Sequence, residues 1–332
     1  MKTKKILYLY TGNHPVHRKF AESVTKDIIP FSKNIPKDYD VYFIEGAYVL
    51  PVLLRKMGKI NRNSKIIVLF ADPRLYYLDK KIKFSYKKKR AYRMNPLRQK
   101  ISKIALRDID GAVCEGEINF ELFKKFCPNI HVKKIIPFIW NERFIKLLKV
   151  KPDLKTKNVL FVGNGPDEYC KGLDFLIKIF KGFKKEFPEA NLEILGDDWD
   201  IKREWIGDGI YFRGKKDIVP FLEKTSLLIH LGQGEGFGIQ ILEALLAGVP
   251  TMVSEGTGAK GVVGEIDSKF VVPLNEERVL TTMRKYFKSS LNYKKKLSEK
   301  GRDSVKRITQ KKQIQEFKKQ FEKLIEEIYN EK

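Results

Sequence analysis

Residues 226–250 have the sequence SLLIHLGQGEGFGIQILEALLAGVP. The apolar run at 226–231 is short and is followed by four glycines within seven residues, which is typical of a buried strand that ends in a loop. From Ile239 onward apolar residues recur at helical spacing, and Gly248 followed by Pro250 is a helix stop signal. The stretch therefore predicts a strand, a glycine-rich loop and a helix.

A loop of this kind, followed by a helix, favours an anion such as a phosphate. The first N–H groups of a helix have no partner within the helix, and glycines let the backbone approach the anion closely. The carboxylates of Glu235 and Glu243 would lie about 12 Å apart along the axis, a separation that suits a sugar on one side of a diphosphate and a ribose on the other. The alternative is that both acids are merely solvated, because a lone glycine-rich loop is a weak signal.

The same segment resembles the Glu-x7-Glu signature of the family-4 retaining glycosyltransferases of the GT-B fold. The resemblance covers roughly residues 130–275. Its matching pieces are Glu235-Gly236-Phe237-Gly238, Glu243-Ala244, Ala247-Gly248-Val249-Pro250, Ser254-Glu255 and, upstream, Ile136-Pro137, Phe161-Val162-Gly163, Lys171-Gly172 and Leu195-Gly196-Asp197.

The resemblance implies an α/β protein with two Rossmann-like domains whose parallel sheets face each other across a cleft. Residues 1–150 would bind the acceptor, 151–310 would bind the nucleotide sugar, and 311–332 would form a helix that packs back on the first domain. The implied activity is transfer of a sugar from a UDP- or GDP-linked donor to a lipid-linked or glycan acceptor, with retention of the anomeric configuration. No cofactor and no metal are expected.

The resemblance also assigns roles to residues on the donor side. Glu235 would hold a donor-sugar hydroxyl, Glu243 would accept from the ribose, and Lys171 would stabilise the leaving diphosphate. The backbone of Gly236, Phe237, Gly238 and Ile239 would contribute N–H groups. The family usually has Arg where Asn164 stands, so Asn164 replaces one cationic phosphate contact by an amide.

On the acceptor side the sequence departs from the family. Ala71-Asp72 stands where a His-Asp or a His is usual, which leaves Asp72 as the first candidate for a catalytic acceptor-side group and His14 as the next. Gly12 lies in the turn at 11–15, where the equivalent turn of the family meets donor phosphates or the acceptor. His14 and His17 have no acidic or cysteine partner near them in the sequence, so the pair does not predict a metal site.

Both halves of the chain alternate between strand and helix patterns, as parallel sheets require. In the first half a strand at 5–10 precedes a helix that carries Phe20, Val24, Ile28 and Ile29, and further strands are expected at 40–45, 65–70, 111–114 and 132–136. A polar linker is expected at 151–157, and the second alternation begins at Asn158. The apolar stripe of 313–328 predicts the final helix.

The charge of the chain is concentrated in its first half. The 332 residues carry a net charge of +25, and residues 1–150 hold 33 Lys and Arg against 13 Asp and Glu, whereas 151–332 hold 33 against 28. Lys80 to Arg107 contains twelve basic residues and no acidic one, interleaved with apolar side chains. We expect this stretch to contact an anionic membrane surface, which makes the protein peripheral on the inner face of the membrane; a solvated lysine-rich face is the alternative.

Other classes are disfavoured. No apolar run is long enough to span a bilayer, and no secretory signal is visible, so a cytoplasmic protein is expected. No Gly-x-Gly-x-x-Gly follows the first strand, which disfavours a dehydrogenase, and no motif of stacked aromatics supports nucleic-acid binding. The two alternatives to an enzyme are a non-catalytic nucleotide-sugar-binding protein and a basic nucleic-acid-binding protein.

Overall fold

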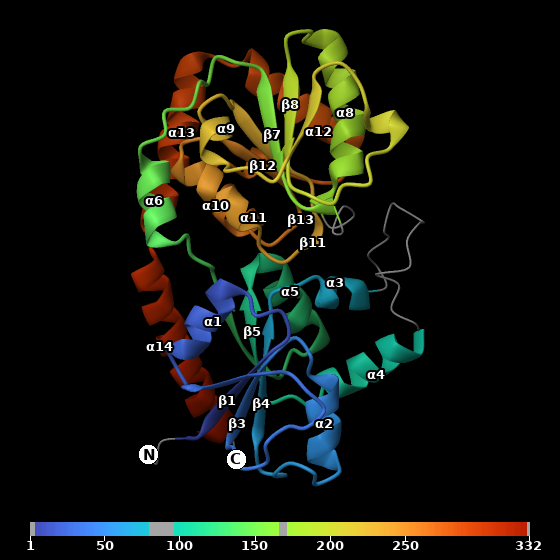
Figure 1. Ribbon diagram of the computed structural model, residues 1–332, viewed down its shortest axis with the longest axis vertical. Helices are drawn as coiled ribbons and strands as arrows, with labels where there is room; N and C mark the ends of the chain where they lie inside the picture. The colour runs from blue at the N-terminus through green and yellow to red at the C-terminus, as the bar shows by residue number, and fades with distance from the viewer. Residues whose placement is uncertain (1–3, 80–95, 166–170, 331–332) are drawn as a thin grey trace. The chain divides into compact units, whose positions relative to one another are not determined.

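The computed structural model describes residues 4–79, 96–165 and 171–330. It divides into two units, unit 1 with residues 1–137 and 311–332, and unit 2 with residues 138–310. Each unit contains a six-stranded sheet in which every neighbouring pair of strands is parallel, with helices packed against it (Figure 1). The α/β fold predicted from the alternation of strands and helices is confirmed.

The sheet of unit 1 has the strand order β2-β1-β3-β4-β5-β6. Its elements are β1 (Ile6–Tyr10), α1 (Pro15–Glu22), β2 (Asp27–Pro30), β3 (Val41–Glu45), α2 (Val49–Lys56), β4 (Lys65–Phe70), α3 (Arg74–Leu78), α4 (Pro96–Leu106), β5 (Gly111–Glu115), α5 (Gly116–Phe126), β6 (His131–Ile135) and α14 (Gln310–Asn330).

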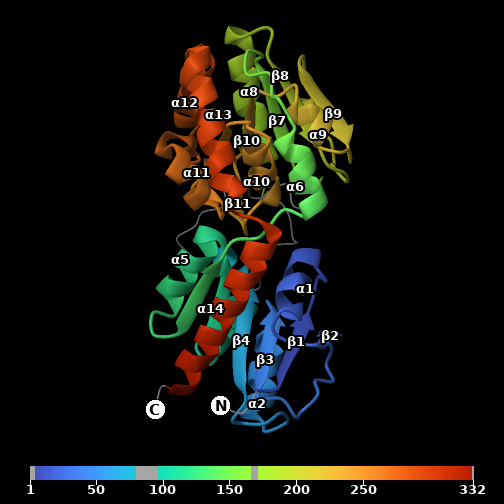
Figure 2. The same ribbon diagram turned by 90° about the vertical axis from the view of Figure 1, so that its left-hand side faces the viewer.

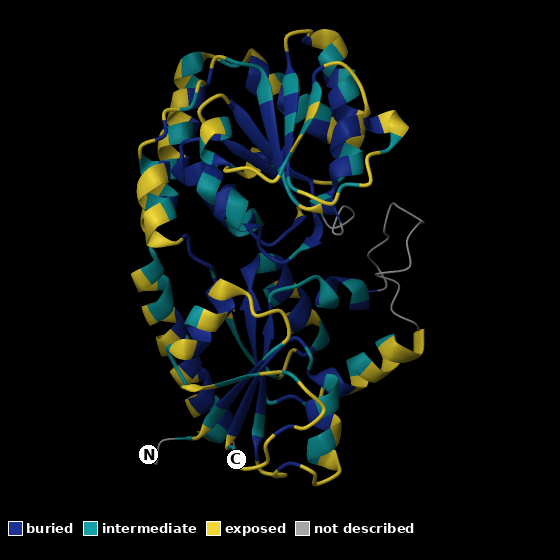
Figure 3. Cartoon of the chain, in the orientation of Figure 1, coloured by how far each residue is buried: buried dark blue, intermediate teal, exposed yellow. Residues whose placement is uncertain are grey.

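Alternate residues of each unit 1 strand point to opposite faces of the sheet, and both faces are buried. On one face Leu7, Tyr42 and Val68 belong to a core that includes buried residues of α2, α3, α4 and α5. On the other face the Tyr8 ring packs 4.9 Å from the Phe43 ring, centroid to centroid. The four central strands, β1, β3, β4 and β5, are accordingly coloured as buried along most of their length (Figure 3).

Helix α14 covers the second face of the unit 1 sheet together with α1 (Figure 2). The Phe317 ring stacks on Phe20 of α1 with centroids 4.8 Å apart, and the Phe321 ring lies 4.8 Å from that of Phe43 in β3. The opposite face of α14 is rich in Lys, Glu and Gln. Among the described residues no helix, α14 included, is both long and apolar enough to cross a bilayer.

The structure corrects one predicted element of unit 1. The helix expected to carry Ile28 and Ile29 ends at Glu22, and residues 27–30 form the edge strand β2, which pairs with β1. The spacing of Phe20, Val24 and Ile28 fits a helix, but the β-branched pair before Pro30 fits an edge strand. Proline is tolerated there because the outer edge needs no N–H donor.

The sheet of unit 2 has the order β14-β12-β10-β7-β8-β9, and a separate two-stranded sheet joins β11 to β13. Its elements are α6 (Asn141–Leu148), β7 (Asn158–Val162), α8 (Leu173–Glu186), β8 (Asn191–Leu195), η2 (Arg203–Trp205), β9 (Ile210–Gly214), α9 (Val219–Leu222), β10 (Leu227–His230), β11 (Gln233–Glu235), α10 (Ile239–Leu246), β12 (Thr251–Ser254), β13 (Gly256–Thr257), α11 (Lys260–Ile266), η3 (Ser268–Phe270), β14 (Val271–Val272), α12 (Glu276–Lys288) and α13 (Leu291–Lys306).

The division between the units falls at residue 137, before the expected boundary at 150 and the expected linker at 151–157. Residues 138–157 group with unit 2 because their backbone is bonded to it. The Arg302 guanidinium donates to the carbonyls of Leu148 and Val150, at 2.8 and 2.9 Å. The Ser226 hydroxyl donates to the carbonyl of the buried Leu154 at 3.2 Å.

Candidate functional site

The glycine-rich loop after β10 is packed closely against the segment that follows β12. The N–H of Gly258 donates to the carbonyl of Glu235 at 2.9 Å, directly after the small sheet of β11 and β13. A Cβ added at Gly258 would lie 1.7 Å from the carbonyl oxygen of Gly236, so only glycine allows this contact. The loop is therefore a defined structure rather than an open turn, a feature that the sequence pattern did not predict.

A second close approach brings Lys171 to this loop. Gly172 has φ +74°, and a Cβ added to it would lie 2.0 Å from the carbonyl oxygen of Leu231, so the start of α8 contacts the end of β10 directly. Lys171 Nζ pairs with Glu235 Oε2. Although burial raises the pKa of Glu235, Lys171 and His230 lower it to about 2, so this carboxylate stays ionised at neutral pH.

His230, the last residue of β10, is the second group on Glu235 and was not singled out from the sequence. Its side chain is fully buried, with Nε2 3.3 Å from Glu235 Oε2, a close polar contact rather than a well-formed hydrogen bond. Nδ1 lies 3.4 Å from Gln240 Nε2, and the ring stacks on Phe161 with centroids 5.9 Å apart. Burial lowers the pKa of His230, so the imidazole is neutral. In the sequence, His230 could have been identified as a polar residue near the end of the apolar run 226–231.

Glu243 lies on α10 and is held by a residue far away in the sequence. Arg143 of α6 places Nε 3.2 Å from Glu243 Oε1, and its Nη1 pairs with Asp217. Burial raises the pKa of Glu243, Asp217 adds to this rise, and Arg143 opposes it. Glu243 is thus a largely buried carboxylate rather than a freely solvated one, since its side chain is 16% exposed.

The other predicted donor-side residues lie in the loop before α10 and after β7. Gly236, Phe237 and Gly238 are buried, and Gly238 precedes α10, which starts at Ile239. In the described part of the chain the N–H groups of Phe237 and Gly238 donate to no other residue. Asn164 follows β7, and its Oδ1 accepts from the N–H of Asp197 at 3.3 Å.

Unit 1 contains a second group of buried charges, at the carboxyl ends of its strands. His17 of α1 places Nδ1 2.6 Å from Glu45 Oε1 and Nε2 3.1 Å from Glu115 Oε2. Glu45 ends β3 and Glu115 ends β5, so the cluster depends on three separate elements. Burial lowers the pKa of His17, but the two carboxylates raise it to about 10, and His17 holds that of Glu45 at about 2 in spite of burial.

The predicted acceptor-side residues His14 and Asp72, and Gly12, which was predicted to bind the donor, lie around this cluster. The N–H of Gly12 donates to Glu45 Oε2 at 2.8 Å, so the carboxylate holds the turn after β1. His14 is exposed, and its ring centroid lies 4.5 Å from that of His17. Asp72 follows β4 and pairs with Arg74, whose Nε lies 2.8 Å from Oδ2. The sequence pointed to Gly12, His14 and Asp72 but not to the buried groups among them.

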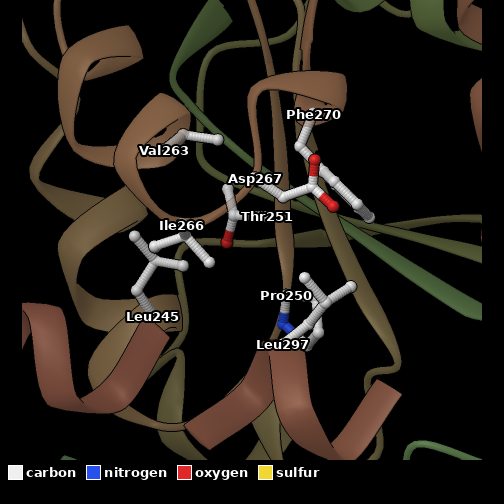
Figure 4. A pocket seen from close by; sticks show the side chains of 8 residues that line it. All are labelled: Leu245, Pro250, Thr251, Val263, Ile266, Asp267, Phe270 and Leu297. Carbon is white, nitrogen blue, oxygen red and sulfur yellow. The ribbon is translucent and has the colours of Figure 1, made fainter. Parts of the chain in front are cut away.

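One cavity of unit 2 is too small to be a ligand site. It lies under α11 and is lined by Asp267, Thr251 and six apolar residues (Figure 4). Its volume is about 10 Å³, which is the size of a single water molecule. It is therefore a packing defect of the core.

Comparison with known proteins agrees with this architecture. Residues 144–304 match the sequence family described as Glycosyl transferases group 1. Lipopolysaccharide glucosyltransferase WaaG of Escherichia coli strain K12 is 24% identical over 176 residues, which are 50% of this chain and 46% of that protein. The chain thus spans about half the length of this curated relative.

Solved structures extend the likeness to both units. Sucrose-phosphate synthase from Thermosynechococcus elongatus superposes with a TM-score of 0.71 at 13% identity, covering 97% of this chain and 99% of that chain. The Anabaena protein HepE, in complex with UDP, superposes with a TM-score of 0.68 at 13% identity, covering 96% and 100%. The fold is that of GT-B glycosyltransferase structures.

Proposed function

We propose that this protein transfers a sugar from a nucleoside diphosphate sugar to an acceptor bound by unit 1, with retention at the anomeric carbon. The observation that carries the proposal is the Lys171–Glu235 pair, beside the glycine-rich loop at the carboxyl end of β10. Parallel α/β sheets bind their ligands at the carboxyl ends of the strands. The structure of HepE with UDP, on a similar fold, adds support for a nucleotide-linked donor.

In this proposal the leaving diphosphate is stabilised by groups that are already in place. Charge develops on the diphosphate as the bond to the sugar breaks, and preorganised donors are often the largest catalytic contribution. Lys171 Nζ and the N–H groups of Phe237 and Gly238 would be those donors. Glu235 would accept from a sugar hydroxyl and so orient the anomeric carbon.

Glu243 would accept hydrogen bonds from the ribose, and Arg143 would keep its carboxylate ionised and oriented. Asn164 would add an amide contact to a phosphate. Because these groups suffice for charge stabilisation and orientation, the proposed reaction uses neither a metal nor a further cofactor. Unchanged turnover in excess EDTA is the expected result, and loss of turnover that Mg²⁺ restores would contradict it.

For the acceptor we propose a lipid-linked or glycan molecule, received beside Asp72 with His14 as the second candidate group. The name of the WaaG relative, a lipopolysaccharide glucosyltransferase, supports an acceptor of this type. The proposed contact of Lys80 to Arg107 with an anionic membrane would bring the protein to a lipid-linked acceptor. Residues 80–95 of that stretch lie outside the described residues.

The proposal is tested by a thermal-shift panel of UDP- and GDP-linked sugars, followed by a turnover assay with the sugar that binds. A ligand at 100 times its dissociation constant stabilises the folded state by about 2.7 kcal/mol. One nucleotide sugar should raise the melting temperature and be consumed when an acceptor is supplied. Binding without turnover on any acceptor would favour a non-catalytic nucleotide-sugar-binding protein, and no binding of any donor would contradict both readings.

A further inference from the structure

A large open cavity lies within unit 2, at the edge of its sheet. Its volume is about 670 Å³, within the range of about 300–1,000 Å³ that ligand pockets occupy. One wall is the segment 269–273, which includes the edge strand β14, and the other is formed by α12 and the start of α13. Strand β12 lies between β14 and β10, and no residue of the Lys171–Glu235 site lines the cavity. We call this cavity the edge groove.

The edge groove combines an apolar floor with a cationic rim. Phe270, Val272 and Tyr286 line it and are buried. Lys269, Arg278 and Lys285 line it and are exposed. Arg278, Thr282, Lys285 and Ser289 are spaced by four, three and four residues, so they lie on one face of α12 along the groove.

The positive charge of the rim is not neutralised. No acidic residue lines the edge groove, and none of its three cations forms an ion pair within the described residues. Asp267, two residues before Lys269, accepts from the Tyr293 hydroxyl at 2.9 Å and from the N–H of Lys269 at 3.0 Å.

Two other cations near α12 do have a carboxylate partner. Arg284 of α12 pairs with Glu186, and Lys178 of α8 pairs with Glu276. Of the cations on α12, Arg278 and Lys285 line the cavity and form no ion pair within the described residues. Guanidinium and ammonium groups bind phosphate oxygens through short charge-assisted hydrogen bonds, while an apolar floor favours a ligand that also carries an apolar or aromatic part.

We propose that the edge groove binds a phosphate ester with an apolar or aromatic part, the phosphate at Lys269, Arg278 and Lys285 and the remainder over Phe270, Val272 and Tyr286. This site is additional to the proposed donor site and does not depend on it. Two sources supply such a ligand: the headgroup region of an anionic lipid, and a soluble phosphate ester such as a nucleoside monophosphate.

Calorimetric titration of the full chain at 0.15 M salt with two probes tests the proposal. Monomeric dihexanoyl phosphatidic acid represents the lipid source and AMP the soluble source, and whichever binds more tightly identifies the class. The groove variant replaces Lys269, Arg278 and Lys285 by Gln. A matched control replaces the exposed Lys295, Lys296 and Lys300 by Gln, so that the same charge is removed from α13, away from the groove.

The expected result is saturable binding of one probe that weakens at least about tenfold, equivalent to about 1.4 kcal/mol, in the groove variant but not in the control. Thr281→Trp, which keeps every charge and fills the groove from α12, should weaken binding as well. Equal binding by the groove variant and the control would overturn the proposal, because it indicates binding elsewhere or a general charge effect. Absence of saturable binding of both probes at millimolar concentration would overturn it too.

Discussion

His17 in unit 1 and His230 in unit 2 are both buried beside a glutamate, but the imidazole of His17 is positively charged and that of His230 is neutral. Each is buried, and each contacts a glutamate at the carboxyl end of its parallel sheet. The pKa of His17 is raised to about 10, whereas that of His230 is lowered. Burial lowers both pKa values, so the difference comes from the partners of each ring.

The partners explain the difference. His17 has a carboxylate on each ring nitrogen, so the charged imidazolium compensates part of two buried negative charges. His230 faces a single carboxylate, and Lys171 already pairs with that carboxylate. A neutral His230 therefore avoids placing two buried cations beside each other. The comparison contrasts a histidine charged by two buried carboxylates with a neutral one that, in the proposed mechanism, would position Glu235.

The largest effect should come from removing the charge in unit 1. His17→Met leaves Glu45 and Glu115 facing each other without a cation, and breaking a buried ion pair costs about 3–5 kcal/mol. We expect a fall of that size in the free energy of unfolding, measured by urea denaturation. His14→Ala, at an exposed neighbour, is the control and should change it by less than about 0.5 kcal/mol. A small effect of His17→Met would mean that the cluster is not the charged triad described above.

The free energy of unfolding should depend on pH in a way that reflects the shifted pKa values of His17 and Glu45. Since the pKa of His17 rises from 6.5 to about 10 on folding, its contribution is complete below pH 6.5 and disappears as the pH rises toward 10. Since the pKa of Glu45 falls from 4.5 to about 2, its contribution is complete above pH 4.5 and disappears as the pH falls toward 2. The difference in stability between the wild type and His17→Met should thus be largest between pH 4.5 and 6.5. A difference that is constant from pH 4 to 10 would contradict the assignment.

In unit 2 the corresponding change should act on catalysis and leave the fold intact. Glu235→Gln keeps the shape of the side chain but removes the charge that Lys171 and a sugar hydroxyl would share. We expect kcat to fall roughly a hundredfold, because the donor sugar loses its orientation, with little change in the melting temperature. Glu277→Gln, an exposed carboxylate on α12, should leave kcat unchanged. Full activity in Glu235→Gln would falsify its assigned role.

A smaller effect is expected from His230. His230→Phe preserves the stacking on Phe161 but removes the nitrogen that lies 3.3 Å from Glu235. We expect kcat to fall about tenfold with KM nearly unchanged, which corresponds to about 1.4 kcal/mol. His230→Gln restores a polar group beside Glu235 and should recover part of the loss. If His230→Phe keeps full activity and His230→Gln loses it, His230 matters for packing and not for the position of Glu235.

The sequence predicted the fold well where local patterns and the global fold agree. The run 226–231, the glycines and the helix from Ile239 correspond to β10, the loop and α10. Residues 27–30 were placed wrongly because the spacing of Phe20, Val24 and Ile28 is helical, while pairing with β1 determines the structure. The contact between β11 and β13 depends on the fit of Gly258 against Gly236, which no periodicity reveals.

Site residues were predictable when they lie in one continuous segment, and less so when they meet through the fold. Glu235, Glu243 and the glycines belong to the loop and helix of one unit. His17, Glu45 and Glu115 are separated by as many as 98 residues. They meet only because β3 and β5 are separated by a single strand in the sheet and α1 brings His17 to their ends. Arg143 reaches Glu243 only because α6 packs on α10 within unit 2, and that segment had been assigned to the first domain.

The smallest effect should come from Glu243, and it sharpens the contrast with Glu235. Burial raises the pKa of Glu243, and Arg143 opposes this rise, so the carboxylate is held for binding without the strong cation pairing that Glu235 has with Lys171. Glu243→Gln loses the acceptor strength of a carboxylate toward the ribose but keeps a neutral hydrogen bond, and one such bond is worth about 0.5–1.5 kcal/mol. We therefore expect the dissociation constant of the donor to rise about two- to tenfold, measured by calorimetry, with kcat almost unchanged. A variant that loses kcat but binds the donor normally would reverse the roles assigned to the two glutamates.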